Sequence, residues 1–393
     1  MKLSTANNAI YHFPVRLALG VIAVTLLVAS QLSCAQKDAG NGSPKAPVDR
    51  VVPIASMEQA RAIPESQRTV FLASVEHAVI REVVRHEQVS AITIAEGLGD
   101  QLDDDGLKVI LQSPSVCELG ILDAGKLTSL SAKALGGTTA IKSLVVHRTS
   151  WDDAALRSLA LSESIQKLVI TSAPNLGDGG VEAVLGMKQL TLLWLEKVPF
   201  TGARFSQLEL KCTAIETVFV DQCPLVENGF CVLISNAKSL QTLSISKSPL
   251  ITDAGVMHLH QAVALRNLGL VGTGCSVEVV KQLVKLELVE FGTDIRLSGS
   301  DVGLVVKIST LRRLTIACPD GAYGEIIDVL AKCRTLERIG FFFATDITDQ
   351  NIGRLAETSA TEFQIGECPN VTQAGLLSLE GMRSGLRVTR MMR

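Results

Sequence analysis

Aromatic side chains are scarce in this chain of 393 residues, at 4% of the total, and neither sign of charge dominates. The 37 basic and 40 acidic residues give a net charge of −3. A nearly neutral chain has no global field to attract nucleic acid, and few aromatic rings are available for stacking against bases. We therefore expect no nucleic-acid partner.

The sequence also lacks motifs of catalysis: it has no glycine-rich phosphate loop and no Gly-x-Ser-x-Gly turn. The run 103–105 (Asp-Asp-Asp) resembles part of a calcium loop, but no Glu stands at the twelfth position, and capping of a helix is the favoured interpretation. His258 and His260 form a lone His-x-His, and His147 has no nearby partner in sequence. We predict no enzyme activity, no metal site and no cofactor.

What the chain does contain is a repeated pattern of aliphatic residues. Leu240, Leu243 and Ile245 show it: one residue, a second three places later, and a third two places after that. The pattern recurs roughly every 25 residues. Its first residues are Val89, Val116, Ile141, Ile165, Leu190, Ile215, Leu240, Leu265, Leu286, Leu311, Leu336 and Ala360. A unit this short cannot bury its own apolar face, so neighbouring units must stack.

Each unit also predicts a local structure. Its alternating start is typical of a short strand, and a second apolar stretch at helical spacing follows. Between them recurs a phrase seen as Ile-Thr-Asp at 251–253 and 347–349. Thr or Asp directly before a helix is the expected cap of its N-terminus.

These units resemble the cysteine-containing leucine-rich repeats found in F-box-type substrate receptors and in bacterial relatives. Cys212 and Cys333 stand three places before the first aliphatic residue of a unit, and Cys223 and Cys368 stand eight places after one. The resemblance implies an α/β solenoid over residues 89–393, an open horseshoe of about twelve units with a concave parallel sheet and convex helices. The nine cysteines include no Cys-x-x-Cys pair, and four of them occupy these repeat positions, so we interpret them as buried core thiols, with one disulfide or a metal site as alternatives.

The N-terminal sequence is typical of a targeting segment. Basic residues, an apolar run from Leu17 to about Ser30 and small residues near Cys34 predict an export signal over residues 1–35. Lipidation at Cys34 is favoured slightly over simple cleavage after Ala35, and an uncleaved membrane anchor stays open. Residues 36–56 are rich in Gly and Pro and predict a flexible linker, and residues 57–88 predict a helical cap over the first repeat.

Two sets of strand positions are candidates for partner contact. The residue four places after each start should point to solvent from the concave sheet, and in four successive units it is apolar: Val145, Val169, Trp194 and Phe219. Phe342 and Phe343 form a second candidate. Exposed apolar strips of this kind are typical of contact surfaces, although a neighbouring loop or the cap could cover them.

A basic column on the C-terminal half comprises Arg266, Arg312, Arg313 and Arg338, whereas Glu196 and Asp221 lie on the N-terminal half. Such charges more often serve solubility than the attraction of an anionic partner.

The sequence as a whole predicts a non-catalytic protein-recognition scaffold at the cell envelope, bound to the membrane through its N-terminal lipid or signal anchor. The alternatives are a structural or adhesion component of the envelope, an envelope sensor that binds a small molecule or glycan, and a ubiquitin-ligase-type substrate adaptor. The last rests only on the resemblance, and the export signal opposes it.

Overall fold

The structure, a computed structural model, describes residues 52–98, 101–318 and 321–391. They form two compact units. The described residues up to Phe200, together with 211–215, make up the N-terminal unit, and residues 201–210 with those from 216 onward make up the C-terminal unit. The predicted export segment at 1–35, Cys34 and most of the linker lie outside the described residues.

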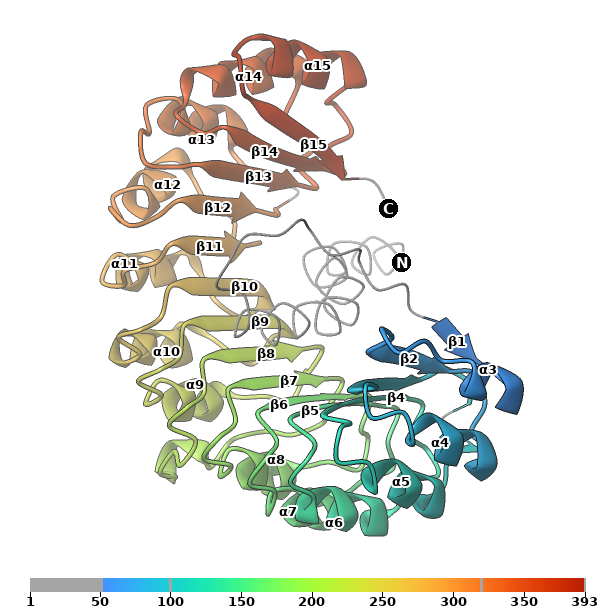
Figure 1. Cartoon of the computed structure of the whole chain (residues 1–393). Coiled ribbons are helices and arrows are strands. Elements are labelled where there is room, and N and C mark those ends of the chain that lie inside the picture. Colours follow the sequence, from blue (N-terminus) through green and yellow to red (C-terminus); the bar gives the residue numbers. More distant parts are fainter. Residues whose placement is uncertain (1–51, 99–100, 319–320, 392–393) are drawn as a thin grey trace, which may run out of the picture. The chain divides into compact units, whose positions relative to one another are not determined.

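In the N-terminal unit strands alternate with helices along the chain (Figure 1). The elements are β1 (Val52–Ile54), α3 (Met57–Arg61), β2 (Thr69–Leu72), α4 (His77–Val83), β3 (Ala91–Ile94), α5 (Asp104–Leu111), β4 (Glu118–Leu122), α6 (Ser129–Gly137), β5 (Ser143–His147), α7 (Asp153–Leu159), β6 (Lys167–Thr171), α8 (Asp178–Val184) and β7 (Leu192–Glu196). Each strand from β1 to β7 pairs in parallel with the next one in the chain.

The C-terminal unit repeats this order, with short 3-10 helices (η) replacing or extending some α-helices. Its elements are η2 (Phe205–Gln207), β8 (Thr217–Asp221), α9 (Asn228–Ile234), β9 (Thr242–Ser248), α10 (Asp253–Val256), η3 (Met257–Gln261), β10 (Asn267–Thr273), η4 (Val277–Val279), α11 (Val280–Leu283), β11 (Glu290–Thr293), α12 (Gly299–Val305), β12 (Arg313–Ile316), α13 (Tyr323–Leu330), β13 (Arg338–Phe342), α14 (Asp349–Gly353), η5 (Arg354–Glu357), β14 (Glu362–Gly366), α15 (Gln373–Gly381) and β15 (Arg387–Met391). Strands β8 to β15 also pair in parallel and in chain order.

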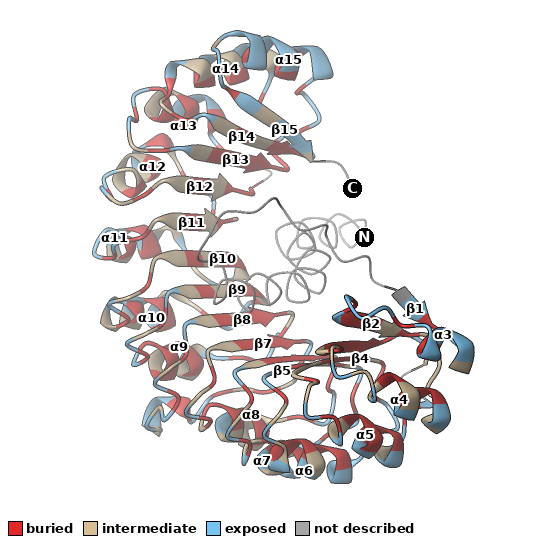
Figure 2. Cartoon of the chain, in the orientation of Figure 1, coloured by how far each residue is buried: buried red, intermediate tan, exposed pale blue. Residues whose placement is uncertain are grey.

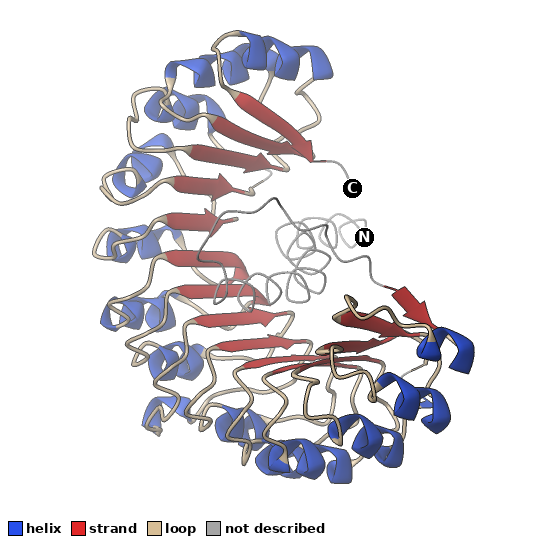
Figure 3. Ribbon diagram, in the orientation of Figure 1, coloured by secondary structure: helices blue, strands red, loops and turns tan. Residues whose placement is uncertain are grey.

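Each unit has two layers, because its helices cover only one face of its strands (Figure 3). The buried residues gather where the helices meet the strands (Figure 2). We call the opposite side of the strands the open face. The alternation of a strand places every second side chain on this face and the others in the core.

The aliphatic triplet supplies the core, as predicted. Leu243, Leu268, Leu314 and Ile339 lie in parallel strands of one sheet, and each is at most 2% exposed. Phe291 of β11 stands in register between Leu268 and Leu314. A repeat of one strand and one helix leaves its apolar side bare unless the next repeat covers it.

One repeat start in the sequence interpretation is wrong by two residues. The register pairs Leu268 with Phe291, so the first aliphatic residue of that unit is Leu288 rather than Leu286. Leu288 is fully buried, and Leu286 is 9% exposed. Leu286, Val289 and Phe291 also fit the triplet spacing, which is why the sequence alone does not separate the two registers.

The segment 57–88 is not the purely helical cap that its sequence suggests. It holds α3, strand β2 and α4, and β2 pairs with both β1 and β3. Val70 and Leu72 of β2 are fully buried. The repeating architecture therefore begins before Val89, because Val70 is a core residue of a strand and not part of a helical face.

A residue with positive φ recurs seven places after the start in most repeats, directly after the strand or, in β9 and β10, at the last residue but one of the strand. These residues are Asp123, Arg148, Ser172, Lys197, Gln222, Lys247, Gly272, Phe343 and Glu367, all with positive φ. Only one of them is glycine, although a left-handed conformation costs other residues roughly 1–2 kcal/mol. Glycine positions in the sequence therefore do not predict this recurring turn.

Candidate functional site

The predicted apolar column is an alignment of neighbouring residues within the N-terminal unit. In the N-terminal unit, Val145 of β5 stands opposite Val169 of β6, which stands opposite Trp194 of β7. In the C-terminal unit, Phe219 of β8 stands opposite Ser244 of β9. All four occupy open-face positions of their strands.

The expected exposure of this column is correct for only half of its members. Val145 and Phe219 are half-buried, but Val169 is 5% exposed and Trp194 is 2% exposed. Val169 has a large side chain on each side in the neighbouring strands, about 4.8 Å away, and such neighbours shield one another. The partner-binding role of the four residues stays a prediction.

Phe342 and Phe343 are not exposed either, at 6% and 9%. The ring of Phe342 covers Gly366 on the adjacent strand, where an added Cβ would lie 2.5 Å from it. Phe343 takes the left-handed turn after β13, with φ 62°, and its N–H donates to the carbonyl of Gly366. The absence of a side chain at Gly366 gives the Phe342 ring a place to lie flat, and sequence position alone does not show this.

The basic column is balanced by acidic neighbours. Each arginine forms an ion pair with a glutamate; the pairs are Arg266–Glu287 at 3.0 Å, Arg312–Glu337 at 3.7 Å, Arg313–Glu290 at 2.8 Å and Arg338–Glu362 at 2.8 Å. The column is therefore not a plain basic surface. On the other half, Glu196 and Asp221 are buried; Lys197 pairs with Glu196, and the Ser246 hydroxyl donates to Asp221.

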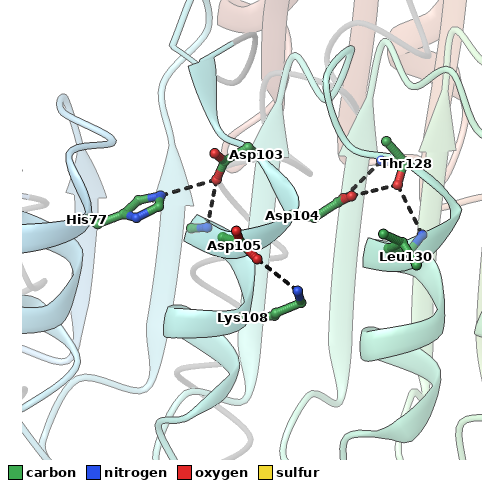
Figure 4. Close-up of polar contacts among 8 residues, drawn as sticks. His77, Asp103, Asp104, Asp105, Lys108, Thr128 and Leu130 are labelled. Carbon is green, nitrogen blue, oxygen red and sulfur yellow. Dashed lines mark hydrogen bonds and ion pairs between the residues drawn. The ribbon is translucent and has the colours of Figure 1, made fainter.

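The three aspartates 103–105 are held by protein contacts (Figure 4). Asp103 is the N-cap of α5: it accepts a hydrogen bond from Gly106 N at 2.8 Å and lies 3.1 Å from His77 Nε2. The Gly106 amide, with help from His77, lowers the pKa of Asp103. Asp105 pairs with Lys108 at 2.8 Å. The capping interpretation is confirmed.

The remaining aspartate, Asp104, reveals a role that the sequence interpretation missed. Its carboxylate reaches the next repeat and accepts hydrogen bonds from the Thr128 amide at 3.0 Å and the Thr128 hydroxyl at 2.5 Å (Figure 4). Thr128 is itself the N-cap of α6. Asp104, the residue directly after the N-cap of α5, therefore binds the N-cap residue of α6.

The same bridge recurs in both units. The pairs are Asp104–Thr128, Asp153–Gly177, Asn228–Thr252, Asp253–Ser276 and Asp349–Thr372, each with the first residue accepting from the backbone N–H of the second. The aspartate of the Ile-Thr-Asp phrase thus joins successive repeats, whereas the threonine occupies the N-cap position of the local helix. The 23- or 24-residue spacing from Asp or Asn to a cap residue is the sequence signal that could have revealed it.

The cysteines behave as core thiols. All eight in the described residues are free, and six of them are buried. Burial raises the pKa of the Cys212 and Cys368 thiols to about 11. Buried thiols with raised pKa values are poor nucleophiles and poor metal ligands.

Two of the histidines singled out in the sequence make local contacts. His147 Nδ1 lies 2.5 Å from the Thr171 hydroxyl, and burial, followed by the Arg148 charge, lowers the pKa of His147. His260 Nδ1 lies against the carbonyl of Met257 in its own turn. Across residues 52–98, 101–318 and 321–391, no three His, Cys, Asp or Glu side chains come together as a metal site.

A membrane-crossing helix, long and apolar enough to span a bilayer, is not found in the described part of the chain.

Comparison with known proteins identifies the fold but no family. No family model matches the chain, and no curated protein matches it in sequence. A chain of the crystal structure of the Rad7 and Elc1 complex in yeast matches with a TM-score of 0.53 and 12% identity, covering 82% of this chain and 80% of that one. A leucine-rich-repeat protein of Leptospira interrogans matches with a TM-score of 0.39 and 14% identity, over 86% of this chain and 99% of that one.

The repeat geometry defines the class. Units of about 25 residues, each with one strand in a parallel sheet and most with a helix on the same side of it, make a leucine-rich-repeat solenoid.

Proposed function

We propose that this protein is a non-catalytic protein-recognition scaffold that is exported to the cell envelope and held there by its N-terminus. The observation that carries the proposal is the one-sided layering of both units. Helices cover one face of the strands, so regularly spaced side chains on the open face have no helix against them. Repeat proteins use such extended surfaces for partners.

The comparison with solved structures agrees with this function. The yeast structure of similar fold is a complex of two proteins, Rad7 and Elc1. A solenoid with this architecture is thus compatible with a stable protein partner.

Half-buried open-face residues are the natural contact points. Val145 and Phe219 place apolar surface on this face, one in each unit. Val169, Trp194, Phe342 and Phe343 would join the contact only if their present cover moved, since each is less than a tenth exposed.

Affinity capture tests the recognition role. The full chain with a C-terminal tag is expressed in its source organism, and captured proteins are compared between wild type, Val145→Glu and Phe219→Glu. We expect a specific partner with wild type and at least a tenfold weaker capture with each variant, since a buried charge at the centre of an interface opposes binding. Leu161→Glu is the matched control, because Leu161 is 75% exposed and lies beyond the end of α7.

If all three variants capture the same partner equally well, the open face is not the recognition surface. If wild type captures no specific protein, the recognition role itself is wrong.

The envelope location rests on the sequence order of basic residues, apolar run and Cys34. Labelled palmitate should enter the wild-type protein and be lost in Cys34→Ser if a lipid is attached there. Export without label would favour simple cleavage, and a cytoplasmic protein with an intact N-terminus would refute export.

A further inference from the structure

Two arginines stand side by side on the open face of the C-terminal unit. Arg313 of β12 and Arg338 of β13 are register partners in adjacent parallel strands. Their side chains are 33% and 37% exposed. Like charges directly opposite each other on neighbouring strands destabilise a sheet. This juxtaposition therefore needs an acidic group to offset it.

The acidic groups that the chain supplies lie on the outer sides of the pair. Arg313 Nε lies 2.8 Å from Glu290 of β11, and Arg338 Nη2 lies 2.8 Å from Glu362 of β14. The order across the strands is thus Glu, Arg, Arg, Glu, and no carboxylate stands between the two arginines. An alternating order would have given each arginine an acid on both sides.

Arg338 has donors that its ion pair with Glu362 does not use. Its Nε is buried and has no hydrogen-bond partner among the described residues. The Arg338 side chain is 37% exposed and its bond to Glu362 uses Nη2, so Nη1 is the donor that remains for a ligand. Arg313 uses Nε for Glu290 and directs Nη2 toward Asn267 at 3.4 Å, away from Arg338.

The strand surface beside the arginines is open at Gly292, whereas at Gly340 an added Cβ would meet Thr315 and Phe342. Two residues further along, the open-face positions of β11, β12 and β13 are Gly292, Thr315 and Gly340. A Cβ added at Gly292 would meet only Thr315, at 3.9 Å, so space remains above this strand. Glycines within strands often mark places where a ligand or another backbone approaches closely.

We propose that Arg313 and Arg338 form a carboxylate-binding site that receives an acidic side chain of a partner protein. The partner carboxylate supplies an anion between the two arginines, where the Glu-Arg-Arg-Glu order has none, and the open space above Gly292 lets the partner backbone approach the strands. Planar guanidinium groups suit this task because they offer paired donors to a carboxylate. The inference rests on the proposed function, since it names the chemistry of the protein partner.

Fluorescence anisotropy with the full chain tests the site. The probe is a blocked, fluorescein-labelled peptide that alternates aspartate and serine, and its neutral twin carries asparagine in place of aspartate. We expect the acidic probe to bind at least about tenfold more tightly than the twin, and R313Q/R338Q to remove this preference. The matched control is R266Q/R312Q, which removes two positive charges from ion-paired arginines outside the site. This variant should keep the preference for the acidic probe.

R313K/R338K separates recognition by paired donors from nonspecific attraction by positive charge. It also shows whether a loss of binding could come from a folding defect. It keeps both charges but loses the paired donors, so we expect severalfold weaker binding with an unchanged melting temperature. The proposal is overturned if R313Q/R338Q binds the acidic probe as well as wild type, or if R266Q/R312Q loses binding equally. It is also overturned if the two arginines support binding to anionic phosphatidylglycerol vesicles but not to the peptide.

The test distinguishes this inference from the proposed function. Equal capture of the natural partner by wild type and R313Q/R338Q overturns the arginine site and leaves the recognition role standing. If R313Q/R338Q loses capture of the natural partner while wild type and R266Q/R312Q keep it, the result supports both the arginine site and the recognition role.

Discussion

At the scale of single residues, the bridge between repeats lets one polar side chain bind both the amide and the hydroxyl of a cap residue in the next repeat. Asp349 accepts hydrogen bonds from the amide of Thr372 at 2.8 Å and from its hydroxyl at 2.6 Å. The Thr372 hydroxyl, followed by its amide, lowers the pKa of Asp349 below 3.8. Asn228 performs the same task in another repeat, since its amide contacts both groups of Thr252.

Because an asparagine makes the same two contacts at position 228, the bridge at Asp349 leads to a prediction for the pH dependence of stability. A lowered pKa means that the carboxylate contributes its full stabilisation above about pH 3.8 and loses it as the pH falls through the folded-state pKa. Asp349→Asn should be close to neutral in stability at pH 7 and should remove this part of the acid sensitivity. Asp349→Ala should lower the free energy of unfolding by about 1 kcal/mol at pH 7, because two hydrogen bonds are lost.

Urea unfolding of the three proteins between pH 3 and pH 7 measures the effect. Equal stability of Asp349→Ala and wild type at pH 7 would show that the bridge does not contribute.

Trp194 illustrates how far position on a strand can mislead about exposure. Its place on the open face follows from the repeat pattern, yet it is 2% exposed. We expect Trp194→Ala to lower the free energy of unfolding by roughly 3–5 kcal/mol, the usual cost of emptying a buried aromatic site. Val145→Ala, at a half-buried position of the same column, should cost much less. Thermal unfolding decides: a Trp194→Ala melting temperature equal to that of wild type would mean that the indole is in fact accessible.

At the scale of the element, the helix that follows each bridge begins against the preceding repeat. Gly375 lies in the first turn of α15, and an added Cβ there would overlap the Asp349 carboxylate. Gly255 meets Asn228 in the same way. Gly255 and Gly375, each three places after the threonine at the N-cap, are thus required by the close approach of two repeats and not by the local turn.

Two glycines of α15 make this testable. Gly375→Ala should lower the free energy of unfolding by about 1–3 kcal/mol, because the methyl group displaces the Asp349 bridge. Gly381→Ala, at the other end of the helix, has nothing within 4 Å of the added Cβ and should be neutral or slightly stabilising. The same loss in both variants would indicate a general effect of alanine in α15 and would refute the overlap.

The sequence was most informative about elements and least informative about what covers them. Triplet spacing predicted the strands with Leu243 and Leu314, because a periodic core must be satisfied in every repeat at once. It did not separate Leu286 from Leu288, since both fit, and it did not reveal β2, whose residues precede the clear pattern. The burial of Phe342 depends on a glycine in the next strand, a tertiary fact with no local signal.

The candidate site was predictable only in part for the same reason. The sequence placed Arg313 and Arg338 on variable strand positions, but their glutamate partners lie 23 and 24 residues away in chain order. Only the register shows that both acids stand on the outer sides of the pair.

At the scale of the whole molecule, every strand pairing within a unit joins neighbours in the sequence. In such a solenoid stability is close to a sum of local terms and nearest-neighbour contacts. Damage to one repeat should therefore open that repeat and its neighbours before it reaches distant ones. Leu314, which is 1% exposed between Phe291 and Ile339, is a suitable place to test this.

Leu314→Ala should cost about 2–5 kcal/mol locally, and hydrogen exchange should speed up in β11, β12 and β13. Exchange in β3 to β6 of the N-terminal unit should stay near the wild-type rate. The mirror variant Leu144→Ala, at a fully buried site in β5, should show the reverse pattern. Uniform acceleration over both units in either variant would mean that the chain opens as one cooperative body, because local opening cannot raise exchange in repeats that keep all their own contacts.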